Sequence, residues 1–168
     1  MKLPLFALAV AVALGVSAPV AQAQDTGAPA QQQTQNTVMA ELVILHATND
    51  GSGIDPKIGK MPELGKPPFS SYNSYKLLER VKLSLGKGQQ TTTKLPNDRV
   101  MGVMLKDILE GSKKGDSSKY VISASIQKPG GTAFLPLLEV NAKAGENFFV
   151  AGQTYKGGVL VLGLKILP

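Results

Sequence analysis

The chain has 168 residues, a formal net charge of +6 and no cysteine. The absence of cysteine excludes disulfides, thiol catalysis and thiolate metal sites, so a folded domain must be held by a packed core. The basic residues are spread along the chain, and no paired metal ligands, basic helix or aromatic RNA-binding signature indicates specific nucleic-acid recognition.

Residues 1–23 have the order of a secretory signal peptide. A positive charge at Lys2 precedes an apolar run over residues 3–16, and small residues follow, ending in Ala21-Gln22-Ala23. The apolar run is shorter than the roughly 20 residues that cross a bilayer as a helix. We therefore expect a bacterial protein that is exported to the periplasm or cell surface, with no transmembrane segment after signal cleavage.

Residues 24–37 are polar, small and rich in glutamine. They show no apolar periodicity and cannot bury enough surface to offset the cost of ordering. We expect a flexible tether here, followed by one domain over residues 38–168, a length that suits a single core.

Apolar or alternating runs separated by turn residues fill the expected domain. In "ERVKLSL" and "YVISASIQ", apolar side chains alternate with polar ones, as in half-buried strands. "ELVILHAT" and "GGVLVLGLKIL" are apolar on both sides and bounded by turn residues, as buried strands are. Pairing of these first and last runs would close a sheet. The pattern predicts a mostly β fold, an antiparallel β-sandwich or partly open barrel, with at most one or two short helices.

Two segments allow more than one structure. "RVMGVMLKDILEG" fits either a helix or the return strand of a hairpin, and we favour the strand because its neighbours are strands. "FSSYNSYKLLE" is open to a helical turn at its start, capped by Ser70 or Ser71. Neither choice changes the mostly β prediction.

The stretch "HATNDGSGID", residues 46–55, concentrates polar groups after a predicted strand. Asn49, Asp50, Ser52 and Asp55 supply oxygens of the kind that calcium binds. Their spacing differs from the EF-hand loop, and the closing bidentate Glu is missing. We favour a tight turn at Asn-Asp-Gly, with calcium as the open alternative and no other cofactor expected.

His46 is the only histidine of the chain. We favour a partly buried, hydrogen-bonded structural histidine that could titrate near neutral pH. A catalytic alternative would combine it with Asp50 or Asp55 and with Ser52 or Ser70. No Gly-x-Ser-x-Gly elbow is present to expose a nucleophile, so we assign no catalytic residue.

Two further candidates for binding surfaces lie elsewhere in the sequence. Tyr72 and Tyr75 lie in a polar context that allows an exposed aromatic patch, although packing in the core is the favoured role. Lys113, Lys114 and Lys119 form the nearest thing to a basic cluster. Such a cluster could meet an anionic envelope polymer, but net charge that merely maintains solubility is the simpler explanation.

The phrases "HATNDGSGIDP", "SSYNSYKLL", "LPNDR" and "GQTYKGGVLVLGLK", in this order, resemble an uncharacterised family of small exported bacterial β-domain proteins. The resemblance implies an exported β domain and carries over no activity and no catalytic residue. We expect a non-enzymatic binding or assembly module that contacts an envelope protein through a strand edge, or an anionic polymer. The alternative is a hydrolase of envelope polymers that uses His46 with a nearby carboxylate. The sequence leaves the oligomeric state open.

Overall fold

The computed structural model describes residues 37–111 and 117–168. The expected signal peptide, the expected tether except Thr37, and both Lys113 and Lys114 lie outside these residues. The described parts contain nine strands and three single 3-10 turns. In chain order they are β1 (Thr37–Thr48), β2 (Gly53–Ile54), η1 (Pro56–Ile58), η2 (Pro62–Gly65), η3 (Phe69–Ser71), β3 (Ser74–Gly86), β4 (Gln90–Lys94), β5 (Val100–Leu109), β6 (Lys119–Gln127), β7 (Phe134–Lys143), β8 (Asn147–Tyr155) and β9 (Gly158–Ile166).

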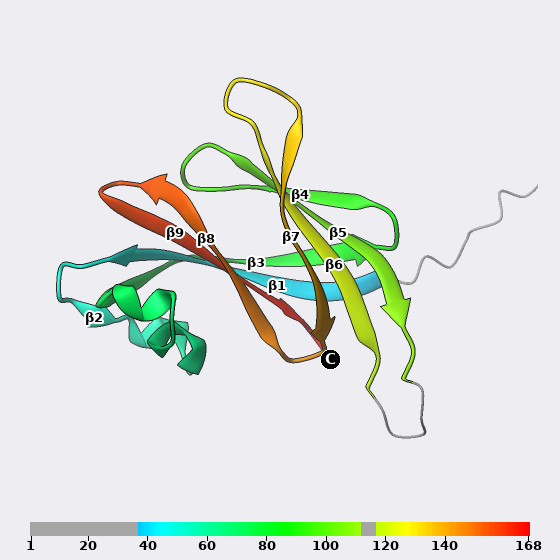
Figure 1. Cartoon of the computed structure of the whole chain (residues 1–168), viewed down its shortest axis with the longest axis horizontal. Helices are drawn as coiled ribbons and strands as arrows, with labels where there is room; N and C mark the ends of the chain where they lie inside the picture. Colours follow the sequence, from blue (N-terminus) through cyan, green and yellow to red (C-terminus); the bar gives the residue numbers. More distant parts are fainter. Residues whose placement is uncertain (1–36, 112–116) are drawn as a thin grey trace, which may run out of the picture. The chain divides into compact units, whose positions relative to one another are not determined.

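The strands form two sheets (Figure 1). The five-stranded sheet has the order β2-β3-β1-β9-β8, and the four-stranded sheet has the order β4-β5-β6-β7. Neighbours are antiparallel except for the short parallel pair β2 and β3. The predicted antiparallel sandwich or partly open barrel is thus confirmed. The ambiguous segment at residues 99–111 forms strand β5, and the first and last apolar runs pair as β1 and β9.

The two central strands of the five-stranded sheet are buried on both faces. On one face Leu42 and Ile44 of β1 pack against the four-stranded sheet. On the other face Val43 and Leu45 belong to a second core cluster. This double burial explains why β1 and β9 read as continuous apolar runs, whereas β3 and β6 alternate.

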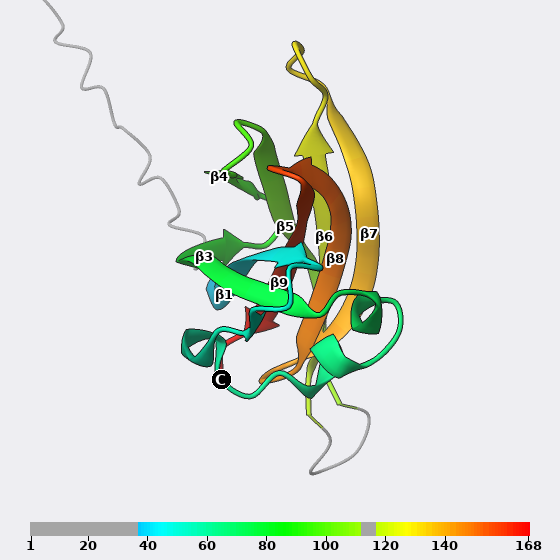
Figure 2. The same cartoon turned by 90° about the vertical axis from the view of Figure 1, so that its left-hand side faces the viewer.

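A loop segment, residues 55–72, covers the outer face of the five-stranded sheet. Its buried side chains, Ile58 and Leu64, pack into the second core with Phe69 at the margin. Figure 2 shows the three 3-10 turns on the side of β1 and β3 away from β5. Arg80 ties this segment to β3, because its guanidinium donates to the carbonyl of Ile58 at 2.8 Å.

One detail of the loop differs from the expectation. The helical turn at residues 69–71 exists, but neither Ser70 nor Ser71 caps it. The turn follows Pro68, and no side chain accepts a hydrogen bond from its first backbone N–H groups. A 3-10 turn of three residues leaves few donors to cap, so proline alone can start it.

The sheets are joined along one side and open along the other. On the joined side, the Thr91 hydroxyl donates to the carbonyl of Ser84 at 2.8 Å, and the Gly88 N–H donates to the carbonyl of Leu105 at 2.8 Å. On the open side, β7 and β8 belong to different sheets and diverge from the turn that connects them (Figure 1). The result is a barrel that closes at β3–β5 and stays open between β7 and β8.

Candidate functional site

The polar loop after β1 is built as a turn. The carboxylate of Asp50 accepts from the Ser52 backbone N–H at 2.9 Å, and that of Asp55 accepts from Lys57 at 2.9 Å. The amide oxygen of Asn49 accepts from the backbone N–H of Asn73 at 3.0 Å. The side-chain oxygens of Asn49, Asp50 and Asp55 therefore each accept from a backbone N–H, which is the turn chemistry that we favoured.

Asp50 is also the most perturbed acid of this loop. Hydrogen bonds from the side chains of Ser74 and Ser52 and from the Ser52 backbone hold the pKa of Asp50 well below its usual range. The Ser74 hydroxyl also lies 2.9 Å from the amide oxygen of Asn73, so its single proton has two possible acceptors. In residues 37–111 and 117–168, no group of three or more His, Cys, Asp or Glu could hold a metal ion.

His46 is held as a structural group at the end of β1. Its Nε2 donates to the carbonyl of Tyr155 at 3.0 Å, and since a carbonyl only accepts, Nε2 carries the proton. The ring meets that of Tyr155 edge-on at 5.2 Å between centroids. At Gly158 a Cβ would overlap the carbonyl oxygen of Ala47 and crowd Nε2 of His46. These contacts fasten the end of β1 to the end of β8.

The described residues show no hydrogen bond or ion pair from His46 to Asp50, Asp55, Ser52 or Ser70. His46, Asp50 and Asp55 instead make separate hydrogen bonds to backbone groups. A hydrolase needs the imidazole oriented by a carboxylate next to a nucleophile or water position. The geometry gives this alternative no supporting contact.

The two candidate tyrosines pack against each other. Tyr75 is 2% exposed, and its hydroxyl donates to the carbonyl of Phe69 at 2.6 Å. Burial raises the pKa of Tyr75. The ring of Tyr72 meets it edge-on at 6.3 Å. Tyr75 therefore cannot belong to an exposed aromatic patch, because β3 turns its side chain into the second core beneath the loop of residues 55–72.

Of the three candidate lysines, only Lys119 lies in the described residues. It is exposed at the start of β6 and stands directly opposite Lys143 of β7. Like charges opposite each other weaken a strand pair. Neither residue lines the two hollows described below.

The sequence did not show which strands lie at the edges of the sheets. In the structure these edge strands differ in length, charge and proline content. β2 has two residues and β4 has five. Beyond β2, the edge of β3 carries four charged side chains between residues 76 and 82. β7 contains Pro136, with a bulge beside it, and the charged Glu139 and Lys143. These short, charged or proline-bearing edges show the devices by which proteins prevent unwanted strand pairing.

β8 lacks most of these devices. Its nine residues, "NFFVAGQTY", contain no charge and no proline, and one bulge interrupts it at Gly152. Phe148 and Val150 are only partly buried where they meet the core shared with the other sheet. On the facing edge, Leu137 and Val140 of β7 are also partly buried. The open side of the barrel therefore presents an uncharged strand edge beside partly covered apolar side chains.

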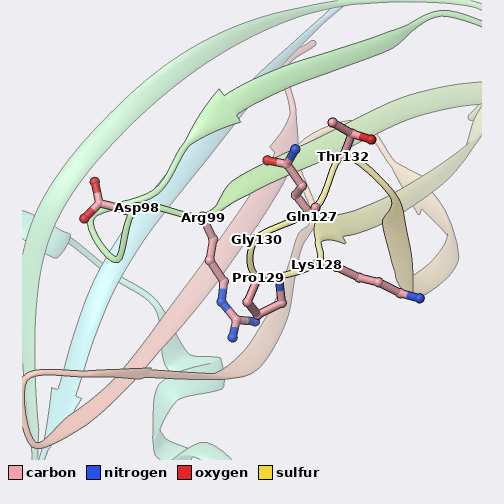
Figure 3. A pocket seen from close by; sticks show the side chains of 8 residues that line it. Asp98, Arg99, Gln127, Lys128, Pro129, Gly130 and Thr132 are labelled. Atoms are coloured by element: carbon pink, nitrogen blue, oxygen red, sulfur yellow. The ribbon is translucent and has the colours of Figure 1, made fainter.

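Two hollows also lie on the described surface. One of about 690 Å³ lies on the outer face of the four-stranded sheet, where Lys106 and Glu139 form an ion pair at 2.7 Å. The other, of about 310 Å³, lies between the connections β4–β5 and β6–β7 (Figure 3). Arg99, which lines the smaller hollow, was not among the predicted site residues. The turn sequence "LPNDR" was a usable signal, because it places a cation just after a rigid turn.

None of the helical turns in the described part of the chain has the length and apolar character to cross a bilayer. Comparisons of the chain with protein-family models, with curated proteins and with solved structures find no match. The function must accordingly be argued from the strand edge and the surface groups.

Proposed function

We propose that this protein is an exported binding or assembly module that captures an extended segment of another envelope protein by strand addition at β8. One observation carries the proposal: β8 is a nine-residue edge strand without charge or proline, at the open side of the barrel. Every other sheet edge in the described residues is short, charged or interrupted by proline. Strand addition is a common mode of peptide recognition, and it needs such an edge.

The backbone of β8 supplies the groups with which a partner strand would pair. One side of the strand pairs with β9 from Asn147 to Tyr155, and in the described structure the other side faces no strand. An incoming segment would pair with the outward N–H and C=O groups and become the sixth strand of the sheet. Such groups are otherwise satisfied by water, so pairing depends on the apolar contacts that accompany it.

The side chains beside β8 define the partner. Successive residues of a strand point to opposite faces, so Phe148 and Val150 face the shared core while Phe149 faces the second core. The ring of Phe149 packs on that of Phe69 at 5.5 Å. A strand laid along β8 would place alternate side chains over the partly covered Leu137 and Val140. The expected partner segment is therefore extended, uncharged and apolar at alternate positions.

The signal-like leader supports action outside the cytoplasm, and cell fractionation tests it. The hydrolase alternative has weaker support, because the imidazole of His46 bonds a carbonyl instead of a carboxylate. Purified protein that cleaves an envelope polymer, with activity lost in His46→Ala, would favour it over strand addition.

The matched variants Thr154→Lys and Thr92→Lys test the edge. Both threonines are exposed, and they lie on edge strands of different sheets, β8 and β4. A photoreactive benzoylphenylalanine at Asn147, the first residue of β8, reports what lies beside the strand in irradiated cells. We expect a covalent adduct with a different protein, reduced about tenfold by Thr154→Lys, which corresponds to 1.4 kcal/mol.

Thr92→Lys adds the same charge and should leave the adduct within about twofold of the parent. Equal loss in both variants would show a charge effect and no role for β8. An adduct of twice the mass of the chain would indicate self-association and contradict capture of a different protein.

A further inference from the structure

The smaller hollow combines a rigid frame with unpaired positive charge. The connection β4–β5 supplies Asp98 and Arg99, and the connection β6–β7 supplies residues 127–132 (Figure 3). Its volume of about 310 Å³ fits one small chemical group of a larger ligand. It lies in neither the β8 edge nor any candidate site that the sequence suggested.

The β4–β5 connection fixes the backbone of Arg99. Leu95 is 2% exposed and anchors the turn in the core. Its N–H donates to the carbonyl of Arg99 at 2.7 Å, and its carbonyl accepts from Asp98 at 3.0 Å. Asp98 has a φ of +63°, a conformation that aspartate tolerates better than most residues. The base of the arginine side chain is therefore held in place before any ligand arrives.

The β6–β7 connection forms the opposite wall. The N–H of Lys128 donates to the carbonyl of Ala133 at 2.8 Å, and its carbonyl accepts from Gly131 at 3.2 Å. Pro129 followed by Gly130 at a φ of +68° gives the features of a type II turn. No hydrogen bond among the described residues engages the N–H of Gly130, so this donor is free.

The charge of the hollow is positive. Arg99 as a whole residue is partly buried. In the described residues its guanidinium has no hydrogen-bond or ion-pair partner, and the ammonium of Lys128 has none either. The one acid of the hollow, Asp98, pairs with Lys94 at 2.8 Å. Figure 3 shows its carboxylate pointing away from Arg99, whose guanidinium lies beside Pro129. An unpaired guanidinium that lines a hollow is suited to a carboxylate or phosphate, which its planar fork binds with two hydrogen bonds.

The uncharged residues that line the hollow indicate which kind of molecule would bear the anionic group. Gln127 and Thr132 offer an amide and a hydroxyl, which donate and accept as sugar hydroxyls require. No aromatic side chain lines the hollow, so nothing there would stack on a nucleobase. We propose that this hollow binds an acidic sugar, with a carboxylate or phosphate on Arg99 and ring hydroxyls on the neutral groups.

The test is an NMR titration of the full chain labelled with ¹⁵N. The probes are glucuronate, glucose 6-phosphate, glucose, inorganic phosphate and duplex DNA. We expect saturable shifts of the Arg99 amide and of amides in residues 127–132 with at least one acidic sugar. Inorganic phosphate should bind more weakly and glucose should give no saturable shift. Binding of glucuronate alone assigns a carboxylate ligand, and binding of glucose 6-phosphate alone assigns a phosphate.

Variants separate the hollow from general charge. Arg99→Gln should weaken binding about tenfold or more, because it removes a charge-assisted pair of hydrogen bonds. The matched control, Lys60→Gln, removes one charge from an exposed lysine of the loop over residues 55–72 and should stay within about twofold. Lys128→Gln, at an exposed side chain, gives a second variant with a smaller loss.

Three results would overturn the proposal. The first is an unchanged affinity in Arg99→Gln, and the second is no saturable shift with either acidic sugar at millimolar concentration. The third is a shift of the same amides by DNA when neither sugar produces one.

Discussion

Replacing Leu45 by alanine tests the second core, which positions both β8 and the covering loop. Leu45 lies on the face of β1 that points away from the four-stranded sheet and is 0% exposed. In a two-layer sandwich without the loop of residues 55–72, that face would meet solvent. The loss of stability on truncation therefore depends on whether the loop packs there.

The expected magnitude follows from burial. A fully buried Leu→Ala substitution costs about 2–5 kcal/mol through lost transfer free energy and the remaining cavity. At an exposed position the same change usually stays within about 0.5 kcal/mol. Leu42→Ala is the matched control, because Leu42 is also 0% exposed but faces the four-stranded sheet. We expect both variants to lose about 2–5 kcal/mol.

Equilibrium denaturation of the two variants, with hydrogen exchange of residues 55–72, provides the assay. Leu45→Ala should also speed exchange in that loop, whereas Leu42→Ala should affect mainly the amides shared by the two sheets. A loss below about 1 kcal/mol for Leu45→Ala, beside a full loss for Leu42→Ala, would show that the loop does not bury this face.

Three further predictions concern single groups. Tyr75→Phe should lose about 1 kcal/mol with its hydrogen bond to Phe69. Burial raises the pKa of Tyr75, so above about pH 10 this tyrosine ionises in the unfolded chain before it does in the folded protein. The parent should therefore lose stability as the pH rises above about 10, and Tyr75→Phe should lose less stability over the same pH range. Gly158→Ala should lower the melting temperature, since its Cβ overlaps backbone, while Gly65→Ala meets open space and should not. Because folding lowers the pKa of Asp50, the ionised carboxylate stabilises the protein fully above about pH 4, and this stabilisation is lost as the pH falls below that value. Acid should therefore reduce the stability of Asp50→Asn less than that of the parent. Calcium or a chelator should leave the melting temperature of the parent unchanged.

The strand content, and the pairing of β1 with β9, could be predicted because the burial of a strand sets the spacing of its apolar residues. The alternation at Leu83 and Leu85 matches their burial in the core, and the two-sided run of β1 matches its burial on both faces. The loop that covers the outer face could not be predicted, because its 3-10 turns are too short to show a period. Its presence explains why Tyr75, in a polar stretch of sequence, is buried.

The candidate sites were less predictable than the fold. Residue chemistry predicted a turn at Asn49 and Asp50 and a structural role for His46. The observed contacts of these residues agree with both predictions. The position of β8 at a sheet edge could not be predicted, because the uncharged sequence "NFFVAGQTY" is equally typical of an interior strand and only the sheet order shows that it lies at the edge. The turn sequence "LPNDR" could have drawn attention to Arg99, but the absence of a partner for its guanidinium among the described residues is visible only in the three-dimensional contacts.

Amide hydrogen exchange along β8 of the free protein tests the central claim most directly. If β8 is an open edge, its outward N–H groups should exchange fast at alternate residues, while those paired with β9, and the amides of β1 and β9, stay protected. Uniform slow exchange over residues 147–155, as in a covered interior strand, would contradict the open edge and the strand-addition function that depends on it.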